Sequence, residues 1–360
     1  MENSPSRSQW LAAVCPKLGA TALVRLAAVL LVLPALAILS VVDPEVAKPA
    51  WDDGVVDGVD ADLFRRAMVQ VTDAHLAEPR GKIAFLFLVR GPLPLEEVWQ
   101  RFFQGHEALF SVYIHASQPG FDCDQEVRYP AFRARQIPSV PISWGGPNLI
   151  RAERRLLAAA LADPWNQRFV LLSESCLPLF NFSHVYDYLF ASPKSFITSH
   201  PSAWRYEPGM APAVNRSQYR KGSQWFALTR RHADMVVADT RVYDAFLQNH
   251  AMIPDESYIQ TLLLMLEPSA VEPRGVTFLH WQSAFSKHPL TITPAQLTPD
   301  FLRSIQRTRL PPKEAIGFLR VPPARLCTLA GRPAHCFLFA RKFNASAIPT
   351  FLALSDSVGF

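Results

Sequence analysis

An acidic pair, Asp255-Glu256, is the feature of the sequence best suited to proton transfer. It follows Pro254 and precedes a helix-like apolar run that ends near Leu266. A carboxylate held in place can act as a general base that takes a proton from a reacting hydroxyl. Carboxylates that follow a proline at the start of a helix can also simply complement the helix dipole. The residues alone leave a catalytic and a purely structural interpretation open.

Metal chemistry would need paired carboxylates, because hard cations prefer oxygen ligands. The apolar run ending at Leu172 is followed by Ser173-Glu174-Ser175, which offers a single carboxylate. Asp122-Cys123-Asp124 is the one serious alternative, although paired aspartates in a polar loop are usually solvated. Asp60-Ala61-Asp62 has the same spacing but lies in a polar segment near the N-terminus. Since no Cys-x-x-Cys occurs either, we expect neither a catalytic metal nor a structural zinc ion.

The elements that would position such groups alternate between strands and helices. Continuous apolar runs predict buried strands at 83–89, 109–115 and 168–172, and the patterns at 95–104 and 147–162 predict helices. This alternation indicates an α/β fold with a mostly parallel sheet and flanking helices. Ligands of such sheets bind beyond the carboxyl ends of the strands. The loops after Val89, His115 and Leu172 are therefore the expected location of the site.

An uncharged apolar run, Leu26–Val42, precedes this body and is just long enough to span a bilayer. Basic residues precede it and acidic residues follow it, which by the positive-inside rule places the N-terminus in the cytosol. A cleaved signal peptide is the alternative, because Ala35-Leu36-Ala37 is similar to a cleavage site. We expect a cytosolic tail at 1–25, a transmembrane helix at 26–42, a polar stem at 43–79 and a lumenal domain at 80–360. The stem includes one helix-like piece at 61–76.

Two features agree with exposure to the secretory lumen. Three glycosylation sequons begin at Asn181, Asn215 and Asn344. Four cysteines lie beyond the apolar run, and Cys327 and Cys336 flank a short turn-rich stretch. We therefore predict a local disulfide between these two cysteines. How Cys123 and Cys176 pair, if they do, is left open.

The composition excludes several classes of protein. Hydrophobic residues make up 49% of the chain and charged residues 19%, so a large core can form and a disordered polymer is excluded. A net charge of +5 is small for 360 residues, and no dense basic run suggests nucleic-acid binding. The Gly-x-Ser-x-Gly elbow of serine hydrolases is also missing from the sequence.

Six separated segments resemble, in order, the plant-type branch of the core-2/I-branching β-1,6-N-acetylglucosaminyltransferases. They are KIAFLFLVRGPLP, RFFQGHEALFSVYIHAS, RFVLLSESCLPLFNFSHVYDYL, YRKGSQWFALTRRHA, IPDESYIQTLL and CFLFARKF, between about residues 82 and 353. The resemblance implies a GT-A-like, Rossmann-type sheet and a type II membrane anchor. It also implies inverting transfer from a UDP-sugar without a metal or other cofactor.

The resemblance assigns roles to both halves of a transfer site. Glu256 matches the family's general base, with Asp255 as a helper or cap, although the plant branch usually has histidine where Ser257 stands. Lys342, next to Arg341, matches a lysine that contacts the donor diphosphate. Fixed cations can replace a divalent metal at a leaving diphosphate. The alternative is that Arg341 and Lys342 are only solvated surface charges. The partner arginine is either Arg325 or Arg320.

Further contacts are weaker expectations. His115 ends the second strand, so a contact with uridine is expected. Trp144 occupies a place where the family has a tryptophan near the donor, although it could equally be core. Glu174 is expected to contact sugar hydroxyls rather than a metal. By resemblance the acceptor side includes Arg220, Lys221 and Trp225.

These expectations define a Golgi membrane glycosyltransferase that moves a sugar, with N-acetylglucosamine as one option, from a UDP-sugar to a glycan or glycoprotein. Its partners would be the donor, the acceptor and the membrane, without nucleic acid. The alternative is a catalytically inactive lumenal relative that only binds sugars or acts as a scaffold. Loss of the base or of the lysine that contacts the diphosphate would favour that alternative, and both Glu256 and Lys342 are present.

Overall fold

The computed structural model describes residues 58–67, 81–281, 286, 288–308 and 327–355. They belong to one compact unit, Val56–Phe360, and the second unit, Met1–Val55, lies outside the described residues. The expected membrane helix at 26–42 also lies outside them, as do the tail and most of the expected stem. None of the helices in the described part of the chain has the length and apolar character needed to cross a membrane.

A six-stranded sheet forms the centre of the unit, in the order β2-β1-β3-β8-β5-β9. Its strands are β1 (Lys82–Val89), β2 (Phe110–Ala116), β3 (Asn166–Leu172), β5 (Ser195–Phe196), β8 (Ala227–Thr229) and β9 (Val271–Glu272). β1 pairs in parallel with both β2 and β3, and β5 pairs in parallel with β9. β8 runs antiparallel to both of its neighbours, β3 and β5. The predicted mostly parallel α/β sheet is confirmed, with β8 as the reversed strand.

Successive residues of β1 point into two separate cores, which is why the strand is apolar on both faces. Ile83, Phe85 and Phe87 belong to one buried cluster, and Ala84 and Leu86 belong to the other. All five side chains are completely buried. A continuous apolar run is therefore required at this position, rather than the alternation of a half-exposed strand.

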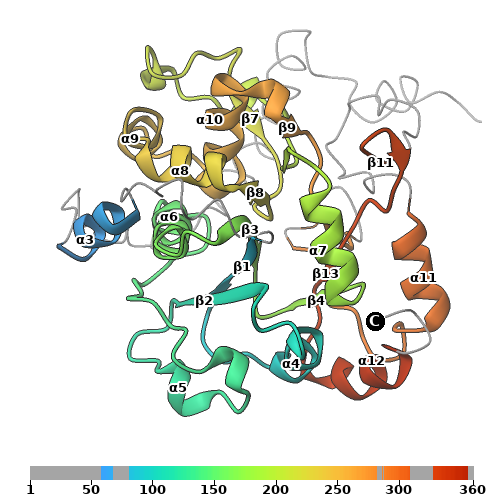
Figure 1. The fold of residues 1–360 in the computed structure, drawn as a ribbon. Helices are drawn as coiled ribbons and strands as arrows, with labels where there is room; N and C mark the ends of the chain where they lie inside the picture. The colour runs from blue at the N-terminus through green and yellow to red at the C-terminus, as the bar shows by residue number, and fades with distance from the viewer. Residues whose placement is uncertain (1–57, 68–80, 282–285, 287, 309–326, 356–360) are drawn as a thin grey trace, which may run out of the picture. The chain divides into compact units, whose positions relative to one another are not determined.

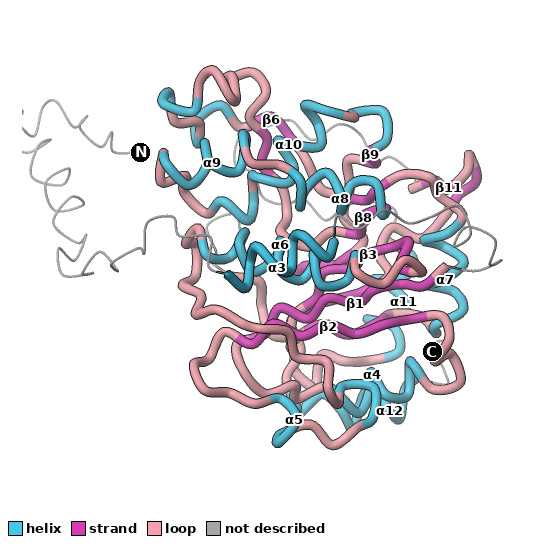
Figure 2. Tube along the Cα trace, turned by 60° about the vertical axis from the view of Figure 1, so that its left-hand side comes forward, coloured by secondary structure: helices cyan, strands magenta, loops and turns pink. Residues whose placement is uncertain are grey.

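Helices cover both faces of the sheet (Figure 1). The first core includes side chains of α4 (Glu96–Phe103), α7 (Phe182–Phe190), α11 (Pro299–Arg307) and α12 (Ile348–Ser355). The second includes side chains of α6 (Asn148–Leu161), α8 (Arg230–Ala238), α9 (Arg241–Gln248) and α10 (Tyr258–Leu266). α3 (Gly58–Ala67), within the expected stem, packs along α6 (Figure 2).

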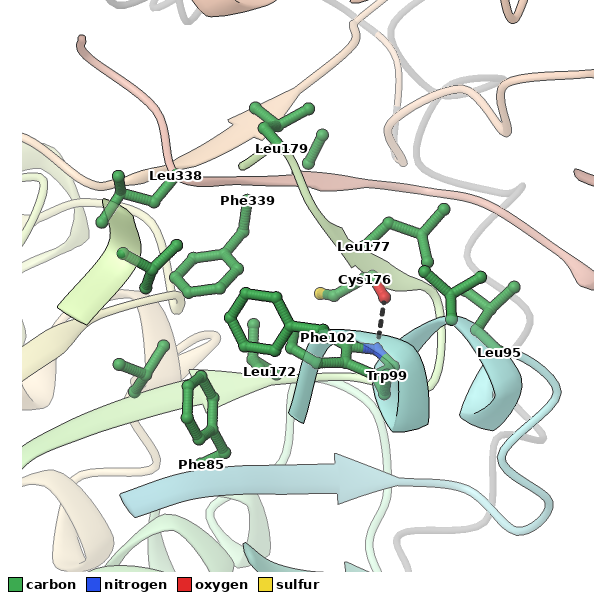
Figure 3. Close-up of a cluster of buried hydrophobic side chains, with 14 of the residues drawn as sticks. Phe85, Leu95, Trp99, Phe102, Leu172, Cys176, Leu177, Leu179, Leu338 and Phe339 are labelled. Carbon is green, nitrogen blue, oxygen red and sulfur yellow. Dashed lines mark hydrogen bonds between the residues drawn. The ribbon is translucent and has the colours of Figure 1, made fainter. Parts of the chain in front are cut away.

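A second, three-stranded sheet joins distant parts of the chain. It consists of β4 (Cys176–Pro178), β13 (Phe339–Arg341) and β10 (Thr277–Leu279), in the order β10-β13-β4. Figure 3 shows the aromatic core beneath it, where the indole N–H of Trp99 donates a 3.0 Å hydrogen bond to the carbonyl oxygen of Cys176. This bond satisfies the polar atom of a large buried side chain. The core thereby fixes β4 and, through pairing, β13.

Short elements complete the unit. They are the helix α5 (Cys123–Glu126), the strands β6 (His200–Pro201), β7 (Arg220–Lys221), β11 (Thr328–Leu329) and β12 (Arg332–Pro333), and 3-10 turns that include Ala203–Arg205 and Pro254–Glu256. The predicted disulfide between Cys327 and Cys336 is confirmed and closes the hairpin formed by β11 and β12. Cys123 and Cys176 are free and buried.

Candidate active site

The acidic pair lies in a 3-10 turn, Pro254–Glu256, that leads directly into α10. The turn is tied to the β7 segment, because the backbone N–H of Gly222 donates a 2.8 Å hydrogen bond to the carbonyl oxygen of Glu256. Only glycine fits at that position, since a Cβ on residue 222 would lie 1.6 Å from the carbonyl oxygen of Thr198. The backbone of this segment therefore fixes where the side chain of Glu256 begins.

Two cations hold the Glu256 carboxylate. Arg205 Nη1 lies 2.9 Å from Glu256 Oε2, and Lys221 Nζ lies 3.0 Å from the same oxygen. The other oxygen, Oε1, receives no hydrogen bond from the residues that the structure describes. The Glu256 side chain is 27% exposed, so a ligand can reach it. The arrangement leaves one carboxylate oxygen available to accept a proton.

Two carboxyl groups in this neighbourhood are buried, those of Asp255 and Glu153. Burial, followed by the nearby charge of Glu256, raises the pKa of Asp255 to about 7. Burial and the charge of Asp255 raise the pKa of Glu153 on α6 well above its ordinary value. Gln224 Nε2 donates a 2.9 Å hydrogen bond to Glu153 Oε1. Because ionised carboxylates are costly to bury, this pair favours protonated forms, and Glu256 remains the exposed acid of the cluster.

The burial of Asp255 should make the stability of the fold depend on pH. Asp255→Asn should reduce this dependence. Between the ordinary pKa of 3.8 and the folded value of about 7, the folded protein holds a proton at Asp255 that the unfolded chain has released. The free energy of unfolding of the parent should therefore fall as the pH rises through this window. Urea unfolding at pH 5 and pH 8 should show a smaller decrease for Asp255→Asn. Equal decreases for parent and variant would contradict the shifted pKa.

The cationic pair Arg341-Lys342 lies next to the carboxyl end of β3. β13 pairs with β4 so that Arg341 is opposite Cys176, and the backbone N–H of Phe343 donates a 2.9 Å hydrogen bond to the carbonyl oxygen of Ser175. Both cations consequently lie beside the loop that carries Glu174, at an end of the sheet where ligands commonly bind. Burial, followed by the positive charge of Arg341, lowers the pKa of Lys342. A bound anion would relieve that repulsion.

One segment connects the two halves of the site. Lys221, which contacts Glu256, and Trp225 are four positions apart. The guanidinium carbon of Arg341 lies 4.1 Å from the centre of the Trp225 ring, within the range of a cation–π contact. The segment from Arg220 to Trp225 therefore joins the acidic turn to the cationic pair. Four residues predicted from distant motifs, Glu256, Lys221, Trp225 and Arg341, are brought into one neighbourhood.

Other predicted residues lie differently. His115 is completely buried, and burial together with the charge of Arg155 lowers its pKa to about 4. Its Nε2 accepts a 3.0 Å hydrogen bond from the backbone N–H of Val140, so it holds a loop, and the uridine contact stays a prediction. Arg220 Nη1 donates to the carbonyl oxygens of Ser217 and Tyr219 at 2.6 and 3.1 Å. Arg320 and Arg325 lie outside the described residues.

Trp144 is 67% exposed and is therefore not a core residue. Its ring lies 5.3 Å from that of His288. A Cβ on the following residue, Gly145, would lie 3.6 Å from the side chain of Ile253, directly before the acidic turn. Trp144 is thus carried by a loop that lies close to Ile253, the residue before the turn of the candidate base.

The acidic motifs considered for metal binding serve local structure. Asp122 accepts a hydrogen bond from the backbone N–H of Asp124 at the start of α5, and Asp124 accepts one from Ala134. Asp60 lies on α3 and forms a partly buried ion pair with Arg151 and a buried one with Arg155, both on α6. Within the described part of the chain, no group of three or more His, Cys, Asp or Glu side chains could hold a metal ion.

Two further features do not form part of the neighbourhood described above. A cavity of about 740 Å³ is lined by residues of α7, α11 and the disulfide hairpin, and Glu256 and Lys342 are not among its lining residues. The three sequon asparagines, Asn181, Asn215 and Asn344, are all exposed, as glycosylation would require. The attachment of glycans stays a prediction.

Two members of the site have no recognisable motif in the sequence. Arg205 lies 51 positions before its partner Glu256, without any motif that connects them. Glu153 lies in the helical stretch Glu153-Arg154-Arg155, which is typical of a solvated helix face, yet all three side chains are buried. The sequence hints at this burial only through the apolar residues that precede and follow the three charged ones.

Comparison with known proteins identifies the family to which the chain belongs. The model of the Core-2/I-Branching enzyme family matches residues 83–306, which include both Glu256 and its two cationic partners. The glycosyltransferase BC10 of rice, Oryza sativa subsp. japonica, is 39% identical over 327 residues, covering 80% of each chain. The predicted family is confirmed: the chain belongs to the core-2/I-branching enzymes and is a glycosyltransferase.

Proposed function

We propose that the protein transfers a sugar from a UDP-sugar to a hydroxyl of a glycan or glycoprotein, with inversion of the configuration at the anomeric carbon. The observation that supports this most is the Glu256 carboxylate, which is held by two cations on one oxygen and is open on the other. Glu256 takes the proton of the acceptor hydroxyl while that oxygen bonds to the anomeric carbon. The bond from this carbon to the diphosphate breaks on the opposite side, and UDP leaves.

The charge of the leaving diphosphate has to be stabilised as it develops. We propose that Lys342 and Arg341 provide this stabilisation, with Arg325 or Arg320 as a further contributor. The partly buried Lys342 suits the task, because its ammonium is weakly solvated and already repelled by Arg341. Glu174, beside them, is proposed to contact sugar hydroxyls. N-acetylglucosamine is the donor sugar that the family's activity suggests.

The alternative function is sugar binding without turnover. The full-length protein in detergent should release UDP from at least one member of a panel of UDP-sugars, and faster with glycan acceptors present. UDP binding without any release across the panel would favour the inactive relative.

We expect transfer to continue in excess chelator. The fixed charges of Lys342 and Arg341 would do what a divalent ion does in metal-dependent transferases, and Glu174 is a single carboxylate. The rate of sugar transfer should be the same, within error, with and without EDTA. A rate that vanishes with EDTA and returns with manganese would overturn this proposal and direct attention to Asp122 and Asp124.

We propose a type II protein of the Golgi membrane, anchored by residues 26–42, with the enzyme domain in the lumen. The charge asymmetry around that run and the three exposed sequons support this topology. In intact microsomes the domain should resist protease until detergent is added, and glycosidase should increase its electrophoretic mobility. Digestion without detergent, or an unchanged mobility, would contradict the topology.

A further inference from the structure

Three of the four exposed large hydrophobic residues that the structure describes lie in segments next to the candidate base or its partners. The large hydrophobic residues that the structure shows as exposed are Trp204 at 68%, Trp144 at 67%, Met252 at 56% and Leu266 at 49%. Trp204 directly precedes Arg205, the partner of Glu256. Met252 directly precedes Ile253, the residue before the acidic turn, and Trp144 is followed by Gly145, which lies close to Ile253. Exposed apolar groups rimmed by charges commonly mark a binding surface.

Trp204 is held in a defined place by backbone structure. It is the central residue of the 3-10 turn Ala203–Arg205. The turn follows β6, which pairs with β7 so that His200 lies opposite Lys221. The backbone N–H of Ser202 donates a 3.3 Å hydrogen bond to the carbonyl oxygen of Tyr219, and that of Arg205 donates a 3.1 Å bond to Ser202. One ladder therefore positions both cations of Glu256 and the exposed indole.

Arg205 contacts both the indole ring of Trp204 and the carboxylate of the candidate base. The guanidinium carbon of Arg205 lies 5.0 Å from the centre of the Trp204 ring, and its Nη1 lies 2.9 Å from Glu256 Oε2. The Arg205 side chain is only 9% exposed, whereas most of the ring remains open to solvent. A ligand that covers the ring would therefore lie near Arg205, whose guanidinium pairs with the Glu256 carboxylate.

We infer that Trp204 is a stacking platform for a sugar ring of the acceptor and thereby a determinant of acceptor specificity. A pyranose ring has an apolar face of C–H groups and a polar edge of hydroxyls, which match an open indole beside charged side chains. The acceptor is favoured over the donor because Trp204 directly precedes Arg205, the partner of the candidate base, whereas Lys342 and Arg341 are proposed to bind the donor diphosphate. This inference rests on the proposed function of the same site.

The test compares Trp204→Ala and Trp204→Phe with the parent protein, full-length and in detergent. Binding to a glycan array is measured in the presence of UDP. The parent should bind a set of glycans, Trp204→Ala should bind them about 10-fold more weakly, and Trp204→Phe should retain most of the affinity. Leu266→Ala removes another exposed apolar side chain, at the opposite end of α10 from the acidic turn, and it should leave glycan binding unchanged.

Two donor measurements separate this inference from the proposed function. Trp204→Ala should keep the parental melting temperature and the parental affinity for UDP, since the ring is exposed and lies on the acceptor side. UDP release from UDP-sugars in the absence of acceptor should also be unchanged. Equal glycan binding by Trp204→Ala and the parent, or no glycan binding by the parent, would overturn the inference even if UDP release continues. Absence of UDP release in the parent would instead refute the proposed function.

Discussion

Glu256→Gln is expected to lower the rate of sugar transfer by about 10²–10⁴-fold while leaving the fold and UDP binding intact. Glutamine has nearly the same shape, and its side-chain oxygen can still accept hydrogen bonds from Arg205 and Lys221. It cannot take a proton from the acceptor hydroxyl, however. The initial rate is to be measured with the best UDP-sugar and acceptor, and UDP affinity by calorimetry.

Glu267→Gln is the matched control for this substitution. Glu267 is also paired with an arginine, Arg231, but it lies at the end of α10 away from the acidic turn. Its substitution should leave the rate within a factor of about two, because the residue lies at the other end of α10 from the acidic turn. Parental transfer by Glu256→Gln would mean that Glu256 is only a residue of the helix start and that the base lies elsewhere.

Lys342→Ala is expected to weaken UDP binding by about 10- to 150-fold and to lower turnover as well. A charge-assisted hydrogen bond contributes about 1.5–3 kcal/mol, which gives this range of affinity. The contact should be present in the ground state and strengthen as charge develops on the leaving diphosphate, so both parameters should change. Calorimetry with UDP and with uridine, together with transfer rates, measures both effects.

The comparison of ligands identifies the cause. Uridine has no phosphate, so its affinity should change much less than that of UDP. Lys194→Ala, which removes a lysine 4.0 Å from Glu272, serves as the control and should change neither. Equal weakening for uridine and UDP would indicate general damage to the pocket. Unchanged affinity for both ligands would place Lys342 outside the donor site.

The strands of the central sheet could be predicted because burial on both faces leaves an unmistakable pattern. β1, β2 and β3 each coincide with an apolar run to within two residues of the predicted ends. The direction of β8 could not be predicted, since an apolar strand has the same pattern whether it pairs parallel or antiparallel. The small sheet of β4, β10 and β13 was also missed, because each of its strands has only three residues.

The site could be predicted only where a motif carries it. Glu256 and the cationic pair lie in segments that resemble a family, and the structure brings those segments together through Lys221 and Trp225. Arg205 has no such signal, because an arginine far away in the sequence becomes a partner only through the pairing of β6 with β7. The burial of the Glu153 carboxyl group could not be predicted, because charged residues on a helix usually face solvent.

The most direct test of the proposed mechanism is the configuration of the glycosidic bond that the enzyme makes. The full-length protein is incubated in detergent with the best α-linked UDP-sugar of the panel and an acceptor, and the product is examined by NMR. A single base that activates the acceptor opposite the leaving diphosphate predicts a β-linked product. An α-linked product would contradict a displacement assisted by Glu256 and would require a different arrangement of the reacting groups.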